Sequence, residues 1–260
     1  MCRILAMSSD LKPYQQKALE EFQKLSVCGK VPASIPAGHK DGWGLAAYGE
    51  DKTGIVFYVR RPYESSYDPV YRNSADIIRE MVLPVIIGHL RKALVGNNTT
   101  ANTHPFVIGN FAFCHNGSVS FTSDDLLESD YKKLVNGQTD SEKLFCFLMQ
   151  LIFKNNDDVS AAIVELLKFI RGKYDYTALN FILTDGKTIW ALREVNEDNE
   201  WVKKLNMRDS YYTLYRGSDD SGKVNLICSE PLPVFDLKWN LIPNHALVST
   251  RADAVATLII

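Results

Sequence analysis

Cys2 directly follows the initiator methionine, a position from which a thiol can become part of the N-terminus. Removal of Met1 would give Cys2 a nucleophilic sulfur and a free α-amine on the same residue. Because an α-amine has a reference pKa of about 7.7–8.0, a useful fraction is neutral near pH 7 and can take a proton. The pair then resembles a threonine activated by its own amine. A second-position cysteine also arises by accident, so the interpretation depends on what the rest of the chain supplies.

Polar residues follow two apolar segments that are predicted to be buried strands. Arg91 follows the strand that begins at residue 85, where a fixed guanidinium could hold a carboxylate through two parallel hydrogen bonds. A surface ion pair would also explain this arginine. Asn116 and Gly117 follow residues 111–114, and an amide side chain beside a glycine N–H can form an oxyanion hole. A hairpin turn explains them too, since Asn-Gly is a common turn dipeptide.

Two further residues have both a chemical and a structural interpretation. Asp140 could bind a substrate ammonium, or could interact favourably with the N-terminal end of a helix dipole. His104 could be a ligand or a positioning group. The five histidines include no HxH or HxxxH pair, so neither a metal site nor a cofactor is expected.

The composition is that of an ordinary globular protein, with 46% hydrophobic and 23% charged residues in a chain of 260. A net charge of −2 gives no electrostatic reason to expect nucleic acid or an anionic membrane as a partner. The longest apolar run, residues 144–153, is too short to span a membrane. No secretory signal is apparent, and the five cysteines are widely spaced without a CxxC pair. A cytoplasmic location is therefore expected.

The elements that must position these residues follow from hydrophobic periodicity and turn signals. Residues 74–82 are predicted to be a helix capped by Ser74, and residues 139–142 have the form of a capping box before a buried helix. Gly172 should follow the end of the next helix, and Asp185-Gly186 should turn a hairpin. The other predicted elements are a helix at 11–25, a turn at 50–54 and strands at 3–7, 44–48, 55–60, 211–216, 224–229, 239–242 and 246–249. This order predicts a single α+β domain over residues 1–260, with mostly antiparallel sheets covered by helices.

Taken together, the clusters are far more specific than each one alone. N-terminal Met-Cys is followed by GHxRxA at 88–93, NxHP at 102–105, HNG at 115–117 and TDSE at 139–142. In this order they resemble the class II glutamine amidotransferases, of the N-terminal nucleophile hydrolase superfamily. Within this family the chain looks most similar to the stand-alone members, because of residues 39–46 and the Ser-Glu-Pro-Leu at 229–232.

The resemblance implies a four-layer αββα sandwich and a role for each site residue. Cys2 would attack the side-chain amide of glutamine and form a glutamyl thioester. Asn116 and Gly117 would stabilise the oxyanion, Arg91 the α-carboxylate and Asp140 the α-ammonium. The expected activity is that of a glutamine amidohydrolase or amidotransferase, and a synthase partner could bind in trans.

The chain departs from the GHTRWATHG pattern of many synthase-linked members. Lys92, Leu94 and Val95 replace the Trp, Thr and His of that pattern, which leaves the substrate open. One alternative is a γ-glutamyl hydrolase acting on glutathione-like or other γ-glutamyl conjugates. Another is a non-catalytic binding module on the same fold, which the complete residue set argues against.

Overall fold

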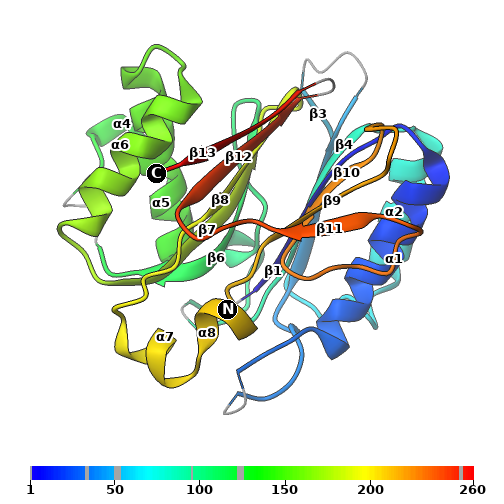
Figure 1. Cartoon of the computed structure of the whole chain (residues 1–260), viewed down its shortest axis with the longest axis horizontal. Helices are drawn as coiled ribbons and strands as arrows, with labels where there is room; N and C mark the ends of the chain where they lie inside the picture. Colours follow the sequence, from blue (N-terminus) through cyan, green and yellow to red (C-terminus); the bar gives the residue numbers. More distant parts are fainter. Residues whose placement is uncertain (1, 33–34, 50–53, 95, 122–125, 252–253) are drawn as a thin grey trace.

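The computed structural model describes residues 2–32, 35–49, 54–94, 96–121, 126–251 and 254–260. In this part of the chain, two β-sheets lie face to face, and every recorded strand pairing is antiparallel (Figure 1). The seven-stranded sheet has the order β11 (Lys238–Leu241), β9 (Tyr215–Ser218), β10 (Asn225–Cys228), β1 (Arg3–Ser8), β4 (Val85–Leu90), β2 (Trp43–Tyr48) and β3 (Ile55–Arg61). The six-stranded sheet has the order β13 (Ala254–Ile259), β12 (Ala246–Arg251), β8 (Thr188–Arg193), β7 (Tyr176–Thr184), β6 (Phe111–Val119) and β5 (Phe106–Ile108).

Helices cover the outer face of each sheet (Figure 1). Helices α1 (Lys12–Cys28) and α2 (Pro69–Glu80) pack on the seven-stranded sheet, while α5 (Asp140–Lys154) and α6 (Val159–Arg171) pack on the six-stranded sheet. The short helices are α4 (Ser129–Lys132), α7 (Glu200–Lys204), α8 (Met207–Ser210) and the 3-10 helix η1 (Thr100–Asn102). The predicted α+β class and αββα sandwich are therefore confirmed. None of the helices in the described ranges is long and apolar enough to cross a membrane.

The side-chain alternation of β1 explains the layers. Leu5 and Met7 pack outward with Phe22 of α1. Ile4 and Ala6 point the other way, into the apolar layer between the two sheets. Because successive residues of a strand face opposite sides, one short apolar strand serves two cores. This buries residues 3–7 of β1 and places the residue before it at the junction of the sheets.

The predicted helix at 74–82 begins earlier than expected. Helix α2 starts at Pro69, and its N-cap is Asp68, whose Oδ1 accepts a hydrogen bond from the Val70 N–H at 3.0 Å. Ser74 lies inside the helix, where its hydroxyl donates to the Val70 carbonyl at 2.7 Å. The prediction that Ser74 caps the helix is wrong, because an aspartate cap followed by proline is the stronger start signal.

The last third differs from its prediction in one segment and agrees in another. Residues 211–216 were predicted to be one strand, but Tyr211 ends helix α8 and β9 begins only at Tyr215. The hairpin at Asp185-Gly186 is confirmed, with Gly186 at a φ of 84° between β7 and β8. Helix α6 ends at Gly172 with a right-handed φ of −88°, so this glycine does not adopt the left-handed conformation of a typical helix end. In the predicted turn at 50–54, residues 50–53 lie outside the described residues.

Candidate active site

Cys2 immediately precedes β1, the middle strand of the seven-stranded sheet, and only 7% of its surface is exposed. It lies in a polar pocket formed by segments that are far apart in the sequence. The pocket is lined by Cys2, Arg91, Lys92, Ala93, Leu94, His104, His115, Gly117, Ser118, Thr139, Asp140 and Ser141. The fold therefore brings five of the predicted site residues into one pocket, and the sixth, Asn116, contacts Cys2 directly.

Asn116 is hydrogen-bonded to the backbone of Cys2. The Cys2 nitrogen, which becomes the α-amine once Met1 is removed, donates to Oδ1 of Asn116 at 2.8 Å. The other end of the amide, Nδ2, is buried and has no hydrogen-bond partner among the described residues. A buried donor without an acceptor costs about 1–3 kcal/mol. This donor is therefore available to a negative charge that develops in the pocket.

Strand β6 sets the direction of Asn116. The strand continues through residue 119, so His115-Asn116-Gly117 lies inside it, and neither the predicted strand end nor the hairpin turn is present. Cys114 faces the layer between the sheets, and Asn116, two residues on, faces the same side. A Cβ on Gly117 would lie 1.8 Å from the carbonyl oxygen of Ala178 on β7. Only glycine permits this close approach of two backbones.

The environment of Cys2 favours the thiolate. Burial alone would raise the pKa of its thiol, but the positive charge of the chain's N-terminal amine and the interaction with His89 outweigh burial and lower this pKa to about 5 in the chain that retains Met1. A hydrogen bond with the backbone of Lys92 acts in the same direction. Both ring nitrogens of His89 are buried and lack a well-directed partner within the described ranges.

Arg91 follows β4 directly, as predicted, and is almost completely buried. Its guanidinium donates to the carbonyl oxygens of Gly96 and Asn97, each at 3.2 Å, and to Oδ1 of Asn98 at 2.9 Å. Burial lowers its pKa, whereas the nearby charges of Cys2 and Asp41 raise it. The loop thus fixes the orientation of a buried cation that interacts electrostatically with the thiol.

Asp41 supports the same loop, a role that the sequence did not reveal. Its Oδ2 accepts a hydrogen bond from the Ala93 N–H at 2.8 Å, and its Oδ1 accepts one from Nδ2 of Asn98 at 3.4 Å. The backbone also connects the two segments, since the Asp41 N–H donates to the Arg91 carbonyl at 3.0 Å. Trp43 and Gly44 begin β2, one residue before the start of the strand predicted at 44–48.

Asp140 is the first residue of α5, and Thr139 is the N-cap. The Thr139 hydroxyl accepts from the Glu142 N–H at 3.2 Å, which is half of the predicted capping box. The reciprocal contact of a capping box, from the Thr139 N–H to the Glu142 carboxylate, is absent from the contacts of the described residues. The Glu142 carboxylate instead accepts from the backbone N–H groups of Asn136 and Gly137. Asp140 itself accepts from the Val119 N–H at 2.9 Å. Its carboxylate is thereby held at the pocket, where it could meet an ammonium group.

His115 and Ser141 form a neutral hydrogen-bonded pair at the same helix end. Burial lowers the pKa of His115 to about 4, although the charge of Asp140 opposes this shift. Its Nε2 lies 3.2 Å from the Ala178 carbonyl oxygen, which can only accept, so the proton belongs on Nε2. The other nitrogen, Nδ1, then accepts from the Ser141 hydroxyl at 2.9 Å. The tautomer follows from these partners.

His104 forms a buried wall of the pocket. Its ring stacks on that of His89 with 4.1 Å between centroids, and burial lowers the pKa of His104 well below its usual value. Gly44 on β2 packs against its backbone, since a Cβ there would lie 2.2 Å from the His104 carbonyl oxygen. No group of three or more His, Cys, Asp or Glu side chains suited to a metal ion occurs among the described residues.

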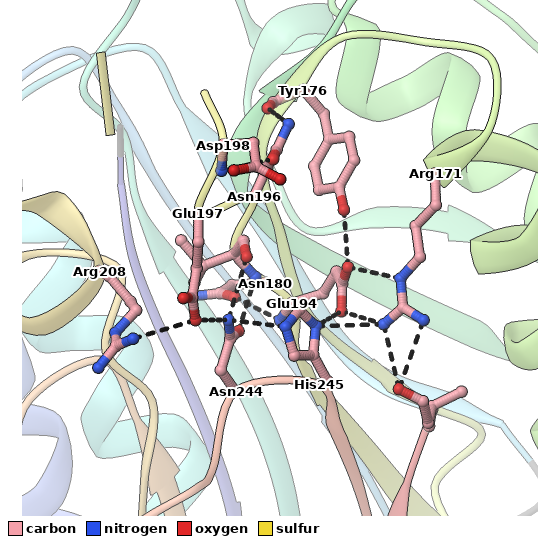
Figure 2. Close-up of polar contacts among 12 residues, drawn as sticks. Arg171, Tyr176, Asn180, Glu194, Asn196, Glu197, Asp198, Arg208, Asn244 and His245 are labelled. Atoms are coloured by element: carbon pink, nitrogen blue, oxygen red, sulfur yellow. Dashed lines mark hydrogen bonds and ion pairs between the residues drawn. The ribbon is translucent and has the colours of Figure 1, made fainter. Parts of the chain in front are cut away.

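A second polar network lies on β7, the strand that pairs with β6. Asn180 of β7 lies opposite Asn116, and its amide donates to the Tyr212 carbonyl at 3.1 Å and accepts from the Glu194 N–H at 2.9 Å. Figure 2 shows the Glu194 carboxylate surrounded by donors. Arg171 pairs with it through two nitrogens at 2.8 and 2.6 Å, and Tyr176 and His245 lie 2.7 and 2.8 Å away. Unlike Asn116, Asn180 therefore uses both ends of its amide.

Known proteins resemble this chain along nearly its whole length. An uncharacterised protein of Methanocaldococcus jannaschii is 28% identical over 265 residues, which cover 95% of this chain and 68% of that protein. The amidophosphoribosyltransferase of the same organism is 34% identical over 239 residues, which cover 87% of this chain and 47% of that protein. This chain therefore corresponds to about half of that enzyme.

A solved structure from Silicibacter pomeroyi, described as a glutamine aminotransferase class-II domain protein, superposes with a TM-score of 0.63. The match covers 99% of both chains at 18% sequence identity, so it establishes the shared fold alone. The sequence profile of the family described as "Glutamine amidotransferases class-II" matches residues 1–259. Because this match covers nearly the whole chain, the chain belongs to the class II glutamine amidotransferases.

Proposed function

We propose that this chain releases ammonia from a γ-glutamyl amide, foremost glutamine, with Cys2 as the nucleophile after removal of Met1. One observation carries the proposal. The hydrogen bond from the Cys2 nitrogen to Asn116 occupies the amide oxygen and leaves the buried Nδ2 donor unpaired. A single side chain can thus orient the nucleophile and stabilise the charge that its attack creates.

The lowered thiol pKa supports a starting state with a thiolate. In the mature form we propose that the Cys2 α-amine is protonated at this stage. The thiolate attacks the amide carbon, and Asn116 Nδ2 and the Gly117 N–H hold the resulting oxyanion. The α-ammonium gives its proton to the departing nitrogen, so ammonia leaves and a glutamyl thioester forms. The neutral amine then takes a proton from water, whose oxygen attacks the thioester. Collapse releases glutamate and restores the thiolate.

An amino-acid head group needs one fixed cation and one fixed anion. Arg91 would hold the α-carboxylate, because its buried guanidinium is oriented by the loop at 96–98. Asp140 would hold the α-ammonium. His104, neutral and stacked on His89, would shape the wall against which the substrate packs.

The mouth of the pocket gives a reason to test larger substrates as well. Lys92 and Leu94 line it in place of the Trp and Thr of the synthase-linked pattern, and 62% of Leu94 is exposed. These replacements leave the leaving amine open, so a γ-glutamyl conjugate with a bulkier leaving amine is a second candidate substrate. We further propose that residues 1–260 act as one domain, and that a synthase partner could bind it in trans and use the ammonia.

The decisive experiment measures ammonia and glutamate release from glutamine, and glutamate release from glutathione, for wild-type protein and Cys2→Ala. Intact mass must first establish that the purified protein begins at Cys2. Release from either substrate that disappears in Cys2→Ala supports the proposal, and the ratio of the two rates identifies the preferred leaving group. If protein that begins at Cys2 hydrolyses no γ-glutamyl compound, the alternative of a non-catalytic binding module is favoured.

A further inference from the structure

The Ser-Glu pair at 229–230 contacts the N-terminal segment, although the two regions are distant in sequence. Pairing between β1 and β10 ends at Leu5 and Cys228, and Ser229 then continues it. The Ser229 N–H donates to the Ile4 carbonyl at 3.1 Å, and its hydroxyl accepts from the Ile4 N–H at 3.0 Å. Both backbone groups of Ile4 are therefore satisfied by one serine, which fixes the chain two residues from the nucleophile.

Glu230 holds the next residue toward the N-terminus. The Arg3 side chain has no exposed surface, and its Nε lies 2.6 Å from Oε1 of Glu230. The same carboxylate oxygen accepts a hydrogen bond from the Lys30 N–H at 2.8 Å. The guanidinium also stacks over the Tyr211 ring, with its carbon 4.3 Å from the ring centroid. A buried guanidinium without its carboxylate is strongly unfavourable, so loss of Glu230 should also disturb Arg3.

This ion pair reaches Cys2 through its carbonyl group. One Arg3 nitrogen, NH1, donates to the Cys2 carbonyl oxygen at 3.1 Å, and the Tyr211 hydroxyl donates to it at 3.4 Å. Asn116 binds the Cys2 nitrogen on the other side. Once Met1 is removed, Cys2 is joined to the chain by one bond only. Without these contacts its backbone could rotate, and a misplacement of about 1 Å can cost ~10²-fold in rate.

We propose that Arg3 and Glu230 form a positioning pair that fixes the Cys2 carbonyl and so aims the thiol and α-amine at the substrate. The inference rests on the proposed role of Cys2 as the nucleophile. Neither side chain touches the substrate. Their effect is transmitted through one backbone oxygen, which explains why a glutamate near the end of the chain belongs to a site built around the second residue.

The test compares Glu230→Gln with wild type, and uses Glu80→Gln as the matched control. Glu80 is an exposed residue of α2 that pairs with Lys12 at 3.7 Å, so the control removes the same charge far from any buried contact. Glu230→Gln keeps the size of the side chain but removes the charge that orients Arg3. We expect kcat per active site to fall about tenfold or more with KM for glutamine within twofold, since the head-group contacts are unchanged.

Active sites are counted by covalent labelling with a glutamine-analogue electrophile, so that misfolded protein does not lower the apparent kcat. Alkylation of each cysteine by iodoacetamide, followed by peptide mass spectrometry, gives a second measurement that needs no turnover. A loosened Cys2 should react at least threefold faster in Glu230→Gln, while buried Cys114 and Cys228 stay protected as in wild type. Slower turnover together with faster alkylation is specific to lost positioning.

Two results would overturn the proposal. One is a kcat per labelled site and a Cys2 alkylation rate that both equal those of wild type. The other is simultaneous alkylation of Cys2, Cys114 and Cys228, which would mean that Glu230 only stabilises the fold. If wild-type protein hydrolyses no γ-glutamyl substrate, the proposed function fails, and the alkylation arm still decides whether Arg3 and Glu230 hold Cys2.

Discussion

Replacement of Asn116 by alanine tests the central contact of the site. The change removes the acceptor of the Cys2 nitrogen, 2.8 Å away, and the buried Nδ2 donor that has no partner in the described part of the chain. Loss of one oxyanion-hole donor typically lowers kcat by about 10²–10³, or roughly 2.7–4 kcal/mol. We therefore expect kcat to fall at least 100-fold. KM should change little, because Arg91 and Asp140 would still hold the head group.

Asn180→Ala is the matched control. Asn180 faces Asn116 across the β6–β7 pair and is equally buried, but both ends of its amide are used by backbone groups of Tyr212 and Glu194. Its removal should cost roughly 2 kcal/mol of stability through unsatisfied backbone groups and lower Tm by about 4–8 °C. Turnover per active site should stay within a few-fold of wild type. Asn116→Ala, by contrast, should lose activity with a smaller change in Tm.

The assay is ammonia release at saturating glutamine, normalised to labelled active sites, with Tm measured on the same samples. The reasoning is refuted if Asn116→Ala retains more than a tenth of the wild-type kcat, because the unpaired donor would then have no part in catalysis. It is equally refuted if Asn180→Ala loses as much turnover per active site. That result would mean that any disturbance of this strand pair abolishes activity.

Three further predictions follow from the same geometry. With a thiol pKa of about 5, Cys2 should be alkylated at a nearly constant rate above about pH 6.5, whereas an ordinary thiol with a pKa of about 8.5 gains reactivity until about pH 10; a rate that keeps rising would contradict the lowered pKa. Gly117→Ala would place a Cβ 1.8 Å from the Ala178 oxygen, so circular dichroism and Tm should reveal a protein destabilised by more than about 3 kcal/mol, and a Tm equal to wild type would refute the close approach. Glu194→Gln tests the lowered pKa of Glu194. Burial raises this pKa, but hydrogen bonds from neighbouring donors, Arg171 foremost, outweigh burial and lower it overall. Its stabilising effect should be present above the unfolded pKa of about 4.3 and disappear as pH falls further, so urea unfolding should find wild type more stable at pH 7 and the difference smaller near about pH 3.5.

Much of the architecture could be predicted because local patterns determine it. The short apolar run at 3–7 predicted a strand that the structure contains as β1, and Thr139 caps its helix as the sequence indicated. The strand end and hairpin turn predicted at Asn116-Gly117 are wrong for a physical reason. This dipeptide usually turns a hairpin, but here the strand continues, and Oδ1 of the asparagine accepts a hydrogen bond from the N-terminal segment instead of from a turn. Polar residues on a buried strand face break the periodicity on which strand prediction depends.

Other features had no local signal at all. The contact between Arg3 and Glu230 joins residues at opposite ends of the chain, and no spacing rule connects them. Asp41 could be suspected of lying near the site, but its support of the Arg91 loop needed coordinates. Helices α7 and α8 are too short for hydrophobic periodicity to reveal them. Because the chain leaves α8 only at residue 210, the strand predicted at 211–216 begins later than expected.

The central place of β1 also constrains when the protein can mature. Its two neighbours are encoded at residues 85–90 and 225–228, so the ribosome must complete most of the chain before the second neighbour can pair. Such distant pairings form late, because loop closure over long separations is entropically costly. During synthesis, the start of the chain should therefore stay accessible to an aminopeptidase. Once β10 and Ser229 close over it, Cys2 is almost completely buried. If Met1 is removed as proposed, its excision should therefore occur on the nascent chain, before the protein has finished folding.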